Sequence, residues 1–298
     1  MSAAQKGTSS VEQCRRFYAE EIRAVTGVPE VLVTAFSRVP RERFLGMAPW
    51  FVAPAVSLYR TEYRSTTDPR DLYHDVLVAI KRDKALNNGQ PTLLARLIGA
   101  LNLRPGGRVL HVGCGAGYYT AILAEVVGPE GSVLGVDVEL DLATRAAANL
   151  DNYPCVSVVH QDAAELALGP RGLCNLDAIL VNATVTHPHP GWLRCLNEGG
   201  VILLPLAVGK GPGDNDAVAI AIERKGSRYF ARPVCLLQLY RSPSLHDPAL
   251  QAQLNQCFES QTLLDLKSVR LDDHARTDTC LAHSPGFCLS TVPADDLP

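Results

Sequence analysis

Mainly apolar runs alternate with segments of helical spacing through the middle of the chain. The apolar runs occupy residues 108–112, 131–138, 155–160, 176–183 and 201–206. The segments in which apolar residues recur with helical spacing occupy residues 118–127, 140–150 and 190–200. Continuous apolar strands that alternate with helices predict a parallel sheet with helices on both faces. We therefore expect a doubly wound α/β fold.

The flanking regions follow other patterns. Helical spacing predicts helices over residues 11–26, 29–37 and 91–101. Residues 40–74 have little periodicity and predict irregular structure, and we interpret the Tyr- and Arg-rich stretch 57–75 as a lid over an active site. The apolar run 75–80 predicts a buried strand, and residues 217–224 with 229–240 predict an antiparallel hairpin.

These patterns divide the chain into three parts. We expect a helical or irregular cap region over residues 1–86, a main domain over 87–240 and a C-terminal extension over 241–298. The extension is more polar than the main domain, and residues 263–271 are its one strand-like piece.

The sequence VGCGAGYY (residues 112–119) places three glycines between an apolar run and a helical segment. The dinucleotide fingerprint is G-x-G-x-x-G, with a small residue at its last position. Here the spacing is G-x-G-x-G (Gly113, Gly115 and Gly117), and the bulky Tyr118 stands where the fingerprint needs a small residue. A nicotinamide-dependent oxidoreductase is therefore a weak alternative. The spacing favours a ligand that lies flat against the turn, such as S-adenosylmethionine, whose carboxylate can use the amides at the following helix N-terminus.

Two acids follow the next two predicted strands. Asp137 ends the strand after the glycine helix, where a carboxylate can accept both hydroxyls of a ribose. Asp162 ends the third strand and is placed for an adenine amino group. The alternative is that both acids only cap helices. A glycine turn followed by two acids at successive strand ends is typical of S-adenosylmethionine sites.

Four segments carry a narrower resemblance. They are SRVPRERFL (37–45), NNGQPTLLARLI (87–98), VLHVGCGAGYYTAILA (109–124) and LDAILVNATVTHPHPGWLRCLNEGGVILLP (176–205). They are similar to the patterns hxxVPRExF, TISQPxxxAxM, VLEIGTGSGYQAAVLA and FDRIIVTAAAPxIPxxLxxQLxxGGRLVIP. Together they resemble protein-L-isoaspartate O-methyltransferases over about residues 11–206.

The resemblance implies a fold, a cofactor and a reaction. The fold is the Rossmann-like class I methyltransferase fold, with a mostly parallel seven-stranded sheet and an antiparallel C-terminal hairpin. The cofactor is S-adenosyl-L-methionine. The reaction transfers its methyl group to a carboxylate of a protein, peptide or small molecule. That carboxylate is ionised at neutral pH, so we expect positioning rather than a general base to supply the rate.

The resemblance also implies three groups of site residues. The cofactor-binding residues are His111, Gly113, Cys114, Gly115, Gly117, Tyr118, Asp137, Val138, Asp162, Ala163 and Asn182. The catalytic segment that shapes methyl delivery is Asn87, Asn88, Gly89 and Gln90. The substrate-binding residues are Asn182, Ala183, Thr184 and His187. We expect Cys114 to be a small spacer rather than a nucleophile.

The chain departs from the family pattern at several of these positions. Asn87, Asn88 and Gly89 stand where the family has T-I-S, and Asn182, Ala183 and Thr184 stand where it has A-A-A. Gly89 replaces the serine of the family's I-S-Q-P segment, and His111 replaces the acid that opens the glycine motif. The alternative function is therefore a binding module that keeps the cofactor site and recognises modified peptides without repair activity.

The composition limits the partners, the cellular location and the metal sites that we expect. The net charge is −3 and no run of basic residues occurs, so we expect no nucleic-acid partner. No apolar run approaches the ~18 residues of a membrane span, and nine cysteines without a small-domain spacing favour a reducing, cytoplasmic location. We expect a monomer or weak dimer. Cys280-x-x-His283 has ligand-like spacing, but with His274 and Cys288 it forms no clear knuckle pattern, so we expect no metal site.

Overall fold

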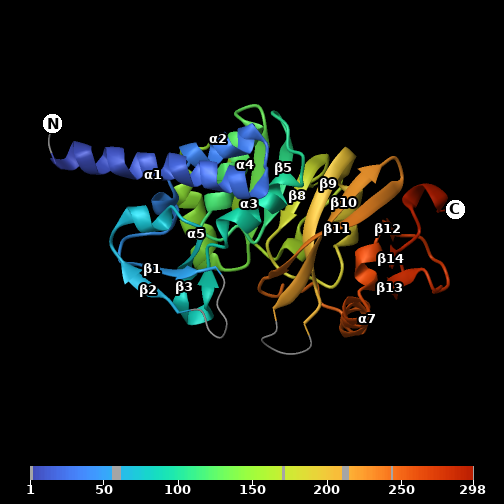
Figure 1. Ribbon diagram of the computed structural model, residues 1–298. Helices are drawn as coiled ribbons and strands as arrows, with labels where there is room; N and C mark the ends of the chain where they lie inside the picture. The colour runs from blue at the N-terminus through green and yellow to red at the C-terminus, as the bar shows by residue number, and fades with distance from the viewer. Residues whose placement is uncertain (1–2, 56–61, 170–171, 210–214, 243, 298) are drawn as a thin grey trace. The chain divides into compact units, whose positions relative to one another are not determined.

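The computed structural model describes residues 3–55, 62–169, 172–209, 215–242 and 244–297 (Figure 1). The chain separates into two compact units, each assembled from several stretches of sequence. Unit 1 comprises residues 1–99, 104–106 and 114–160. Unit 2 comprises residues 100–103, 107–113 and 161–298.

Several helices of unit 1 pack around an aromatic core. They are α1 (Ala3–Thr26), α2 (Glu30–Arg38), α3 (Pro91–Gly99) and α4 (Tyr118–Val127), and a further helix, α5 (Leu140–Asn149), packs on the strands described below. Helix α1 packs against α2 and α3, and α2 packs against α4. The rings of Tyr18, Phe36 and Tyr118 are buried between them and meet edge to face. The predicted helices are confirmed, although α1 begins at Ala3, well before Val11.

A small antiparallel sheet in unit 1 corrects the prediction of irregular structure over residues 40–74. Its order is β2 (Arg64–Thr66), β1 (Trp50–Pro54), β3 (Val76–Lys81) and β4 (Leu86–Asn87). Leu45, Val52, Leu72 and Val78 form its own small core. Strands of two to five residues show too few alternations to be recognised in the sequence. The first residues of the predicted lid, 57–61, lie outside the described residues.

Unit 1 also contains a parallel pair of strands. These are β6 (Ser132–Asp137) and β7 (Val156–His160), with Asp137 opposite His160 in the register. Helix α5 packs against both strands, and α4 packs against β6. Asp137 is therefore the last residue of its strand, as the sequence predicted.

Unit 2 contains the other strands of the predicted α/β fold. Strand β5 (Arg108–Val112) pairs in parallel with β8 (Leu176–Val181), which pairs in parallel with β9 (Leu196–Ala207). Strands β10 (Asp216–Lys225) and β11 (Arg228–Gln238) add the predicted antiparallel hairpin. Strands β5 to β11 are thus the seven predicted strands, parallel at first and antiparallel at the hairpin.

One predicted helix in unit 2 is shorter than expected. Helix α6 is only Pro190–Arg194, and the strand β9 begins at Leu196, inside the predicted helix 190–200. The β8–β9 register shifts between Leu176 and Ala178. A side chain on Gly200 would lie 2.9 Å from the carbonyl oxygen of Leu176, so the close approach of the strands requires glycine here.

The C-terminal extension continues the antiparallel strands of unit 2. It contains α7 (Pro248–Glu259), β12 (Ser268–Arg270), β13 (Cys280–Ser284) and β14 (Phe287–Ser290). Strand β12 pairs with β11, β14 pairs with β12, and β13 pairs with β14. These strands lie beside one another in Figure 1, with α7 packed against β13. The sequence predicted only the piece that contains β12.

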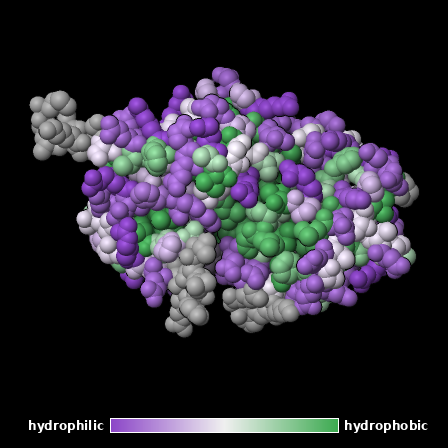
Figure 2. All heavy atoms as spheres, viewed as in Figure 1, coloured by the Kyte–Doolittle hydropathy of each residue, from purple (hydrophilic) through white to green (hydrophobic). Residues whose placement is uncertain are grey.

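The surface of unit 2 is not uniformly polar. Figure 2 shows hydrophobic residues gathered on the visible face over β9 to β11. On β11, Leu236 is 65% exposed. Among the residues with described placement, no helix is both long and apolar enough to cross a membrane.

Candidate functional site

The glycine turn of unit 1 connects β5 to α4 through strongly bent backbone. Gly115 and Gly117 have positive φ angles of 57° and 93°. A side chain on Gly117 would lie 2.8 Å from Leu150 Cδ1 and 3.4 Å from Ala146 Cα, so α5 leaves room only for glycine. The Asn149 side chain donates a 2.9 Å hydrogen bond to the carbonyl of Ala116, which fixes the turn against the end of α5.

Asp137 closes this turn from the end of β6. Its Oδ2 accepts a 2.7 Å hydrogen bond from the Gly115 amide, and its Oδ1 accepts a 2.9 Å bond from the Glu139 amide. Only 7% of the residue is exposed. Burial raises the pKa of Asp137, while the two amide hydrogen bonds oppose that rise. The predicted ribose acid therefore lies in contact with the predicted glycine loop.

The segment after Asp137 is held by charged residues and leaves one apolar side chain exposed. Lys81 Nζ lies 2.7 Å from Glu139 Oε2 and 2.6 Å from Asp141 Oδ1, which joins the end of β3 to the β6–α5 turn. Val138 is 46% exposed between them. The exposed side chain of Val138 beside Asp137 offers an apolar surface for the flat face of a nucleobase.

Two predicted cofactor residues of unit 1 lie in the core. Cys114 is buried against Gly135, and burial raises the pKa of its thiol well above the usual range. This supports a spacer role rather than a nucleophile. Tyr118 is 1% exposed and packs on Phe36 and Phe44. The Tyr118 ring therefore belongs to the aromatic core, and the cofactor-binding role of this residue stays a prediction for its backbone at the start of α4.

The predicted catalytic segment, residues 87–90, begins at the last residue of β4 in unit 1. The Gly89 amide donates a 2.8 Å hydrogen bond to Asn87 Oδ1, which forms a tight side-chain turn. Gln90 Nε2 donates to Asp75 Oδ2 at 2.7 Å, so this side chain is held by the protein itself. Asn88 is 8% exposed, and its Nδ2 has no hydrogen-bond partner within the described part of the chain. Asn88 is therefore the member of the segment that is prepared to donate to a ligand.

The backbone of Gly89 explains why serine is absent here. Its φ angle is +74°, and a side chain would lie 3.0 Å from Leu94 Cδ2 and 3.6 Å from Tyr119 Cε2. A serine would be strained both by the backbone conformation and by these neighbours. The glycine at this position therefore suits the left-handed backbone that the segment adopts here.

Two residues that the sequence did not single out position this segment. The guanidinium of Arg41 is fully buried and donates to the carbonyls of Leu72 at 2.8 Å and Val76 at 2.9 Å. It also donates to the Gly89 carbonyl at 3.4 Å. Asp75 Oδ1 accepts from the amide of Thr92 at 2.9 Å and so caps the start of α3. The signal in the sequence was weak: Arg41 stands in the segment VPRERF, and Asp75 precedes an apolar run.

In unit 2, the end of β5 meets the end of β8. Gly113 has a φ angle of +71°, and a side chain on it would lie 3.2 Å from the carbonyl oxygen of Asn182. His111 is fully buried, and its Nε2 lies 3.2 Å from Asn182 Nδ2. Burial lowers the pKa of His111 to about 3, so the ring is neutral and its Nε2 can accept from the amide. The Asn182 side chain is thereby oriented, and its Oδ1 is buried without a partner among the described residues.

Asp162 has a structural contact as well as a predicted ligand role. Its Oδ1 accepts from the Ala164 amide at 3.0 Å and so caps a short 3-10 helix (Ala163–Glu165). The same oxygen accepts from Ser244 Oγ at 2.9 Å. The capping alternative is thus observed at Asp162, and Ser244 of the extension is a neighbour that the sequence did not indicate. Ala163 is buried in the first turn of this helix.

The start of the C-terminal extension runs along the predicted substrate loop after β8. The Thr184 amide donates to the Tyr240 carbonyl at 2.7 Å, and the Ser242 amide donates to the Thr184 carbonyl at 2.9 Å. Ala183 is half-buried in this loop. The imidazole of His187 packs against Phe287 of β14, with ring centroids 6.0 Å apart. Burial lowers the pKa of His187, which favours a neutral ring.

Unpaired polar atoms mark several predicted site residues. Within the described ranges, buried side-chain atoms without a hydrogen-bond partner include Asn88 Nδ2, Asn182 Oδ1 and Thr184 Oγ1. A buried polar atom without a partner is costly, and a ligand is one of the groups that can satisfy it. These three atoms therefore support ligand contacts in both units.

Comparison with known proteins agrees with this geometry. Residues 52–230 match the model of the Protein-L-isoaspartate(D-aspartate) O-methyltransferase (PCMT) family. The chain is 30% identical over 210 residues to the Protein-L-isoaspartate O-methyltransferase of Cronobacter sakazakii (strain ATCC BAA-894), covering 70% of this chain and 86% of that protein.

Two solved structures share the fold. One is a protein-L-isoaspartate O-methyltransferase, with a TM-score of 0.64 and 21% identity, covering 80% of this chain and 69% of that one. The other is a putative protein-L-isoaspartate O-methyltransferase from Plasmodium falciparum in complex with S-adenosyl-L-homocysteine. Its TM-score is 0.57 and its identity 18%, covering 76% of this chain and 97% of that one.

The predicted resemblance, the α/β methyltransferase fold, the O-methyltransferase class and S-adenosylmethionine as cofactor are confirmed at the level of the family. The match includes the catalytic segment, the glycine turn, both strand-end acids and the loop after β8. The chain belongs to the protein-L-isoaspartate O-methyltransferase family.

Proposed function

We propose that this chain uses S-adenosylmethionine to methylate the free carboxylate of isoaspartyl residues in peptides and proteins. The observation that carries the proposal is the buried Asp137 in contact with the glycine turn, inside the segment that matches the family. In an isoaspartyl residue the chain continues through the side-chain carboxyl, so the α-carboxylate is free to accept a methyl group.

The residues of the site fit the cofactor. The carboxylate of Asp137 is the group that we assign to the ribose hydroxyls, and the neighbouring Val138 is the side chain that we assign to the adenine. The adenine role of Asp162 stays a prediction from the sequence. The glycine turn lets the backbone approach the aminoacyl part closely, because Gly115 carries no side chain. When bound, S-adenosylmethionine supplies an electrophilic methyl group.

Apart from His187, the polar side chains assigned to the acceptor are amides and a hydroxyl rather than bases. A carboxylate is ionised at neutral pH, so its oxygen can attack without losing a proton. Asn88 Nδ2 of unit 1 is a buried donor without a partner in the described structure, and an amide of this kind can hold such a carboxylate. His111 and His187 are neutral by burial and are not needed to remove a proton. Positioning and exclusion of water then supply the rate.

The experiment compares two peptides that differ only in the linkage at one residue. The full chain is incubated with methyl-labelled S-adenosylmethionine and either the isoaspartyl peptide or its aspartyl twin. Base-labile methanol release measures ester formation, and Asp137→Ala serves as the inactive control. We expect transfer only to the isoaspartyl peptide. Equal transfer to both peptides, or none while calorimetry shows that the cofactor binds, would contradict the proposal.

A second candidate is a recognition module without repair activity. The observation that favours it is Gly89, whose backbone conformation disfavours the serine of the family pattern. Such a module would bind the isoaspartyl peptide more tightly than its twin, with S-adenosylhomocysteine present, and would transfer no methyl group. Fluorescence anisotropy of the two labelled peptides measures the binding preference, and the methanol-release assay on the same preparation separates the candidates.

We also propose the cellular location, the substrate class and the oligomeric state of the chain. Nine free cysteines support a reducing, cytoplasmic location. The absence of a basic run supports a protein substrate rather than nucleic acid. A monomer or weak dimer stays a prediction. The division at residues 86 and 240 stays a prediction, and the end of the family match at residue 230 supports a separate extension. Cell fractionation and sedimentation test the location and the oligomeric state.

A further inference from the structure

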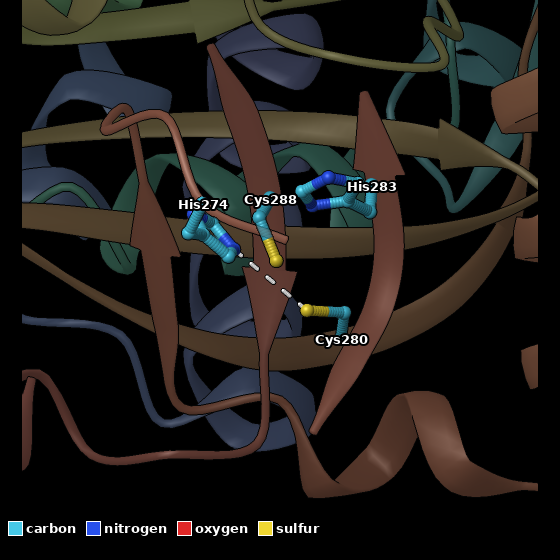
Figure 3. A group of neighbouring side chains, drawn as sticks. All are labelled: His274, Cys280, His283 and Cys288. Carbon is cyan, nitrogen blue, oxygen red and sulfur yellow. Dashed lines mark hydrogen bonds between the residues drawn. The ribbon is translucent and has the colours of Figure 1, made fainter. Parts of the chain in front are cut away.

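Four potential metal ligands converge in the C-terminal extension. They are His274, Cys280, His283 and Cys288, and their ligand atoms all lie within 4.8 Å of one another. Figure 3 shows the two thiols and the two imidazoles around one point, although the residues come from a loop and two strands. Both cysteines are buried and neither forms a disulfide.

A β-bulge brings three of the four onto one face. In a regular strand, residues three apart point to opposite faces of the sheet. In β13 the register shifts between Cys280 and Ala282, so Cys280 pairs with Ser290 while His283 pairs with Cys288. Cys288 and Ser290 are two apart on β14 and share a face, so Cys280 and His283 also share it. The extra residue in β13 thus places Cys280 and His283 on the same face of the sheet, although residues three apart in a regular strand point to opposite faces.

The two histidines are prepared to ligate. His274 Nδ1 lies 3.0 Å from the Asp272 carbonyl oxygen and 3.2 Å from Asp272 Oδ2, which leaves Nε2 facing Cys280 Sγ at 3.7 Å. A hydrogen bond from the second ring nitrogen to a carboxylate or carbonyl is the usual support of a metal-bound histidine. His283 Nδ1 is buried with no partner in the described part of the chain.

Supporting hydrogen bonds hold the ligands in place. The Thr277 amide donates to Cys280 Sγ at 3.3 Å. Gln253 of α7 fixes the backbone of His283, accepting from its amide at 2.9 Å and donating to its carbonyl at 3.1 Å. Arg270 pairs with Asp272, which supports His274. The cluster is therefore tied to both α7 and β12.

We propose that His274, Cys280, His283 and Cys288 bind one zinc ion that joins the loop before β13 to the hairpin of β13 and β14. In a tetrahedral site with ~2.3 Å Zn–S and ~2.0 Å Zn–N bonds, adjacent sulfur and nitrogen ligands lie about 3.5 Å apart. The 3.7 Å between Cys280 Sγ and His274 Nε2 is close to this distance. Four protein ligands leave no open position, so the role is structural. Two thiolates and two neutral imidazoles balance the charge of the ion. This proposal replaces the prediction, made from the sequence, that these four residues form no metal site.

The test uses the full chain, purified without a histidine tag under reducing conditions. We expect about one zinc per chain by elemental analysis. Replacing zinc with Co²⁺ should produce thiolate-to-cobalt charge transfer and the intense d–d bands of a tetrahedral site. Cys288→Ser should abolish stoichiometric zinc, whereas the matched control Cys174→Ser, in the same unit but outside the cluster, should retain it. Asp272→Asn keeps all four ligands and should weaken zinc binding by about 10- to 100-fold.

Each contrary result is specific. Octahedral cobalt spectra without thiolate charge transfer, or zinc content that is unchanged in Cys288→Ser, would show adventitious metal and overturn the proposal. So would a Cys280–Cys288 disulfide in the reduced preparation with no bound metal. Because the cobalt spectrum is recorded on the unaltered chain, a variant that fails to fold does not leave the question open.

Discussion

The glycine turn and the His/Cys cluster are two kinds of site within one chain. The turn is built from backbone conformation and one acid, and its members follow one another between residues 114 and 137. The cluster is built from side chains of a loop and two strands, and its geometry depends on one extra residue in β13. The first kind can be recognised from spacing, whereas the second becomes visible only when the register is known. The comparison also separates their roles, with ligand binding at the turn and local stability at the cluster.

The largest expected effect tests this separation of roles. Asp137→Ala removes a charged acceptor and should weaken binding of S-adenosylhomocysteine by about 10- to 150-fold, from ~1.5–3 kcal/mol for a hydrogen bond to a charged group. Zinc content should be unchanged. Calorimetry and elemental analysis of the same preparation measure both. Asp141→Asn, which changes an exposed acid in the first turn of α5, is the matched control. Loss of zinc together with cofactor affinity would contradict independent sites.

Lowering the pH should lower the free energy of unfolding through the buried His111. Because the folded-state pKa of His111 is lowered to about 3, the unfolded chain binds the proton first as the pH falls below ~6.5. Stability is therefore full above that pH and is lost progressively below it, by about 2 kcal/mol between pH 6.5 and 5.0. Denaturant unfolding of His111→Gln should show a smaller loss. An equal loss in His111→Gln and in the unaltered chain would contradict this assignment.

The serine of the family pattern should be unfavourable in this backbone. We expect Gly89→Ser to lower the free energy of unfolding by more than the ~1–2 kcal/mol of a left-handed residue alone, because Leu94 lies 3.0 Å from the new atom. Gly106→Ser is the matched control, since Gly106 has a φ of +79° and no atom near its missing side chain. Equal losses of unfolding free energy in Gly89→Ser and Gly106→Ser would show that the neighbours of Gly89 add no penalty to that of its backbone conformation.

The smallest effect tests whether the extension contributes to the cofactor site. Ser244→Ala removes the hydroxyl that donates to Asp162 and should weaken cofactor binding by about 2- to 10-fold, from ~0.5–1.5 kcal/mol for one hydrogen bond. The capping bond from Ala164 remains. Ser242→Ala is the control, because Ser242 contacts Thr184 through its backbone amide. Equal affinities in the two variants would confine the extension to a structural role.

The contrast between the two sites also shows how far the sequence could predict the structure. Strands β5 to β11 were predicted because each combines a long apolar run with a clear end. The strands β1 and β2 were missed because they are too short to show a period, and α6 was predicted too long because Gly200 permits a strand where the spacing was helical. Asp137 was predicted from its place at a strand end.

Residues that act through long-range contacts were not predicted. Arg41 reaches Gly89 across 48 positions, and Ser244 reaches Asp162 across 82. The metal ligands were seen in the sequence, but their odd spacing predicts opposite faces until the bulge in β13 is known. The core position of the Tyr118 ring was not predicted, because the pattern does not tell which neighbours a helical residue will meet.

The most direct measurement of the central claim locates the methyl ester. The full chain and S-adenosylmethionine are incubated with one peptide that contains an isoaspartyl residue, an aspartyl residue, a glutamyl residue and a free C-terminus. Tandem mass spectrometry then identifies the carboxyl group that is methylated. The account predicts an ester on the isoaspartyl α-carboxyl alone. An ester at another carboxyl, or none while the cofactor is bound, would contradict it.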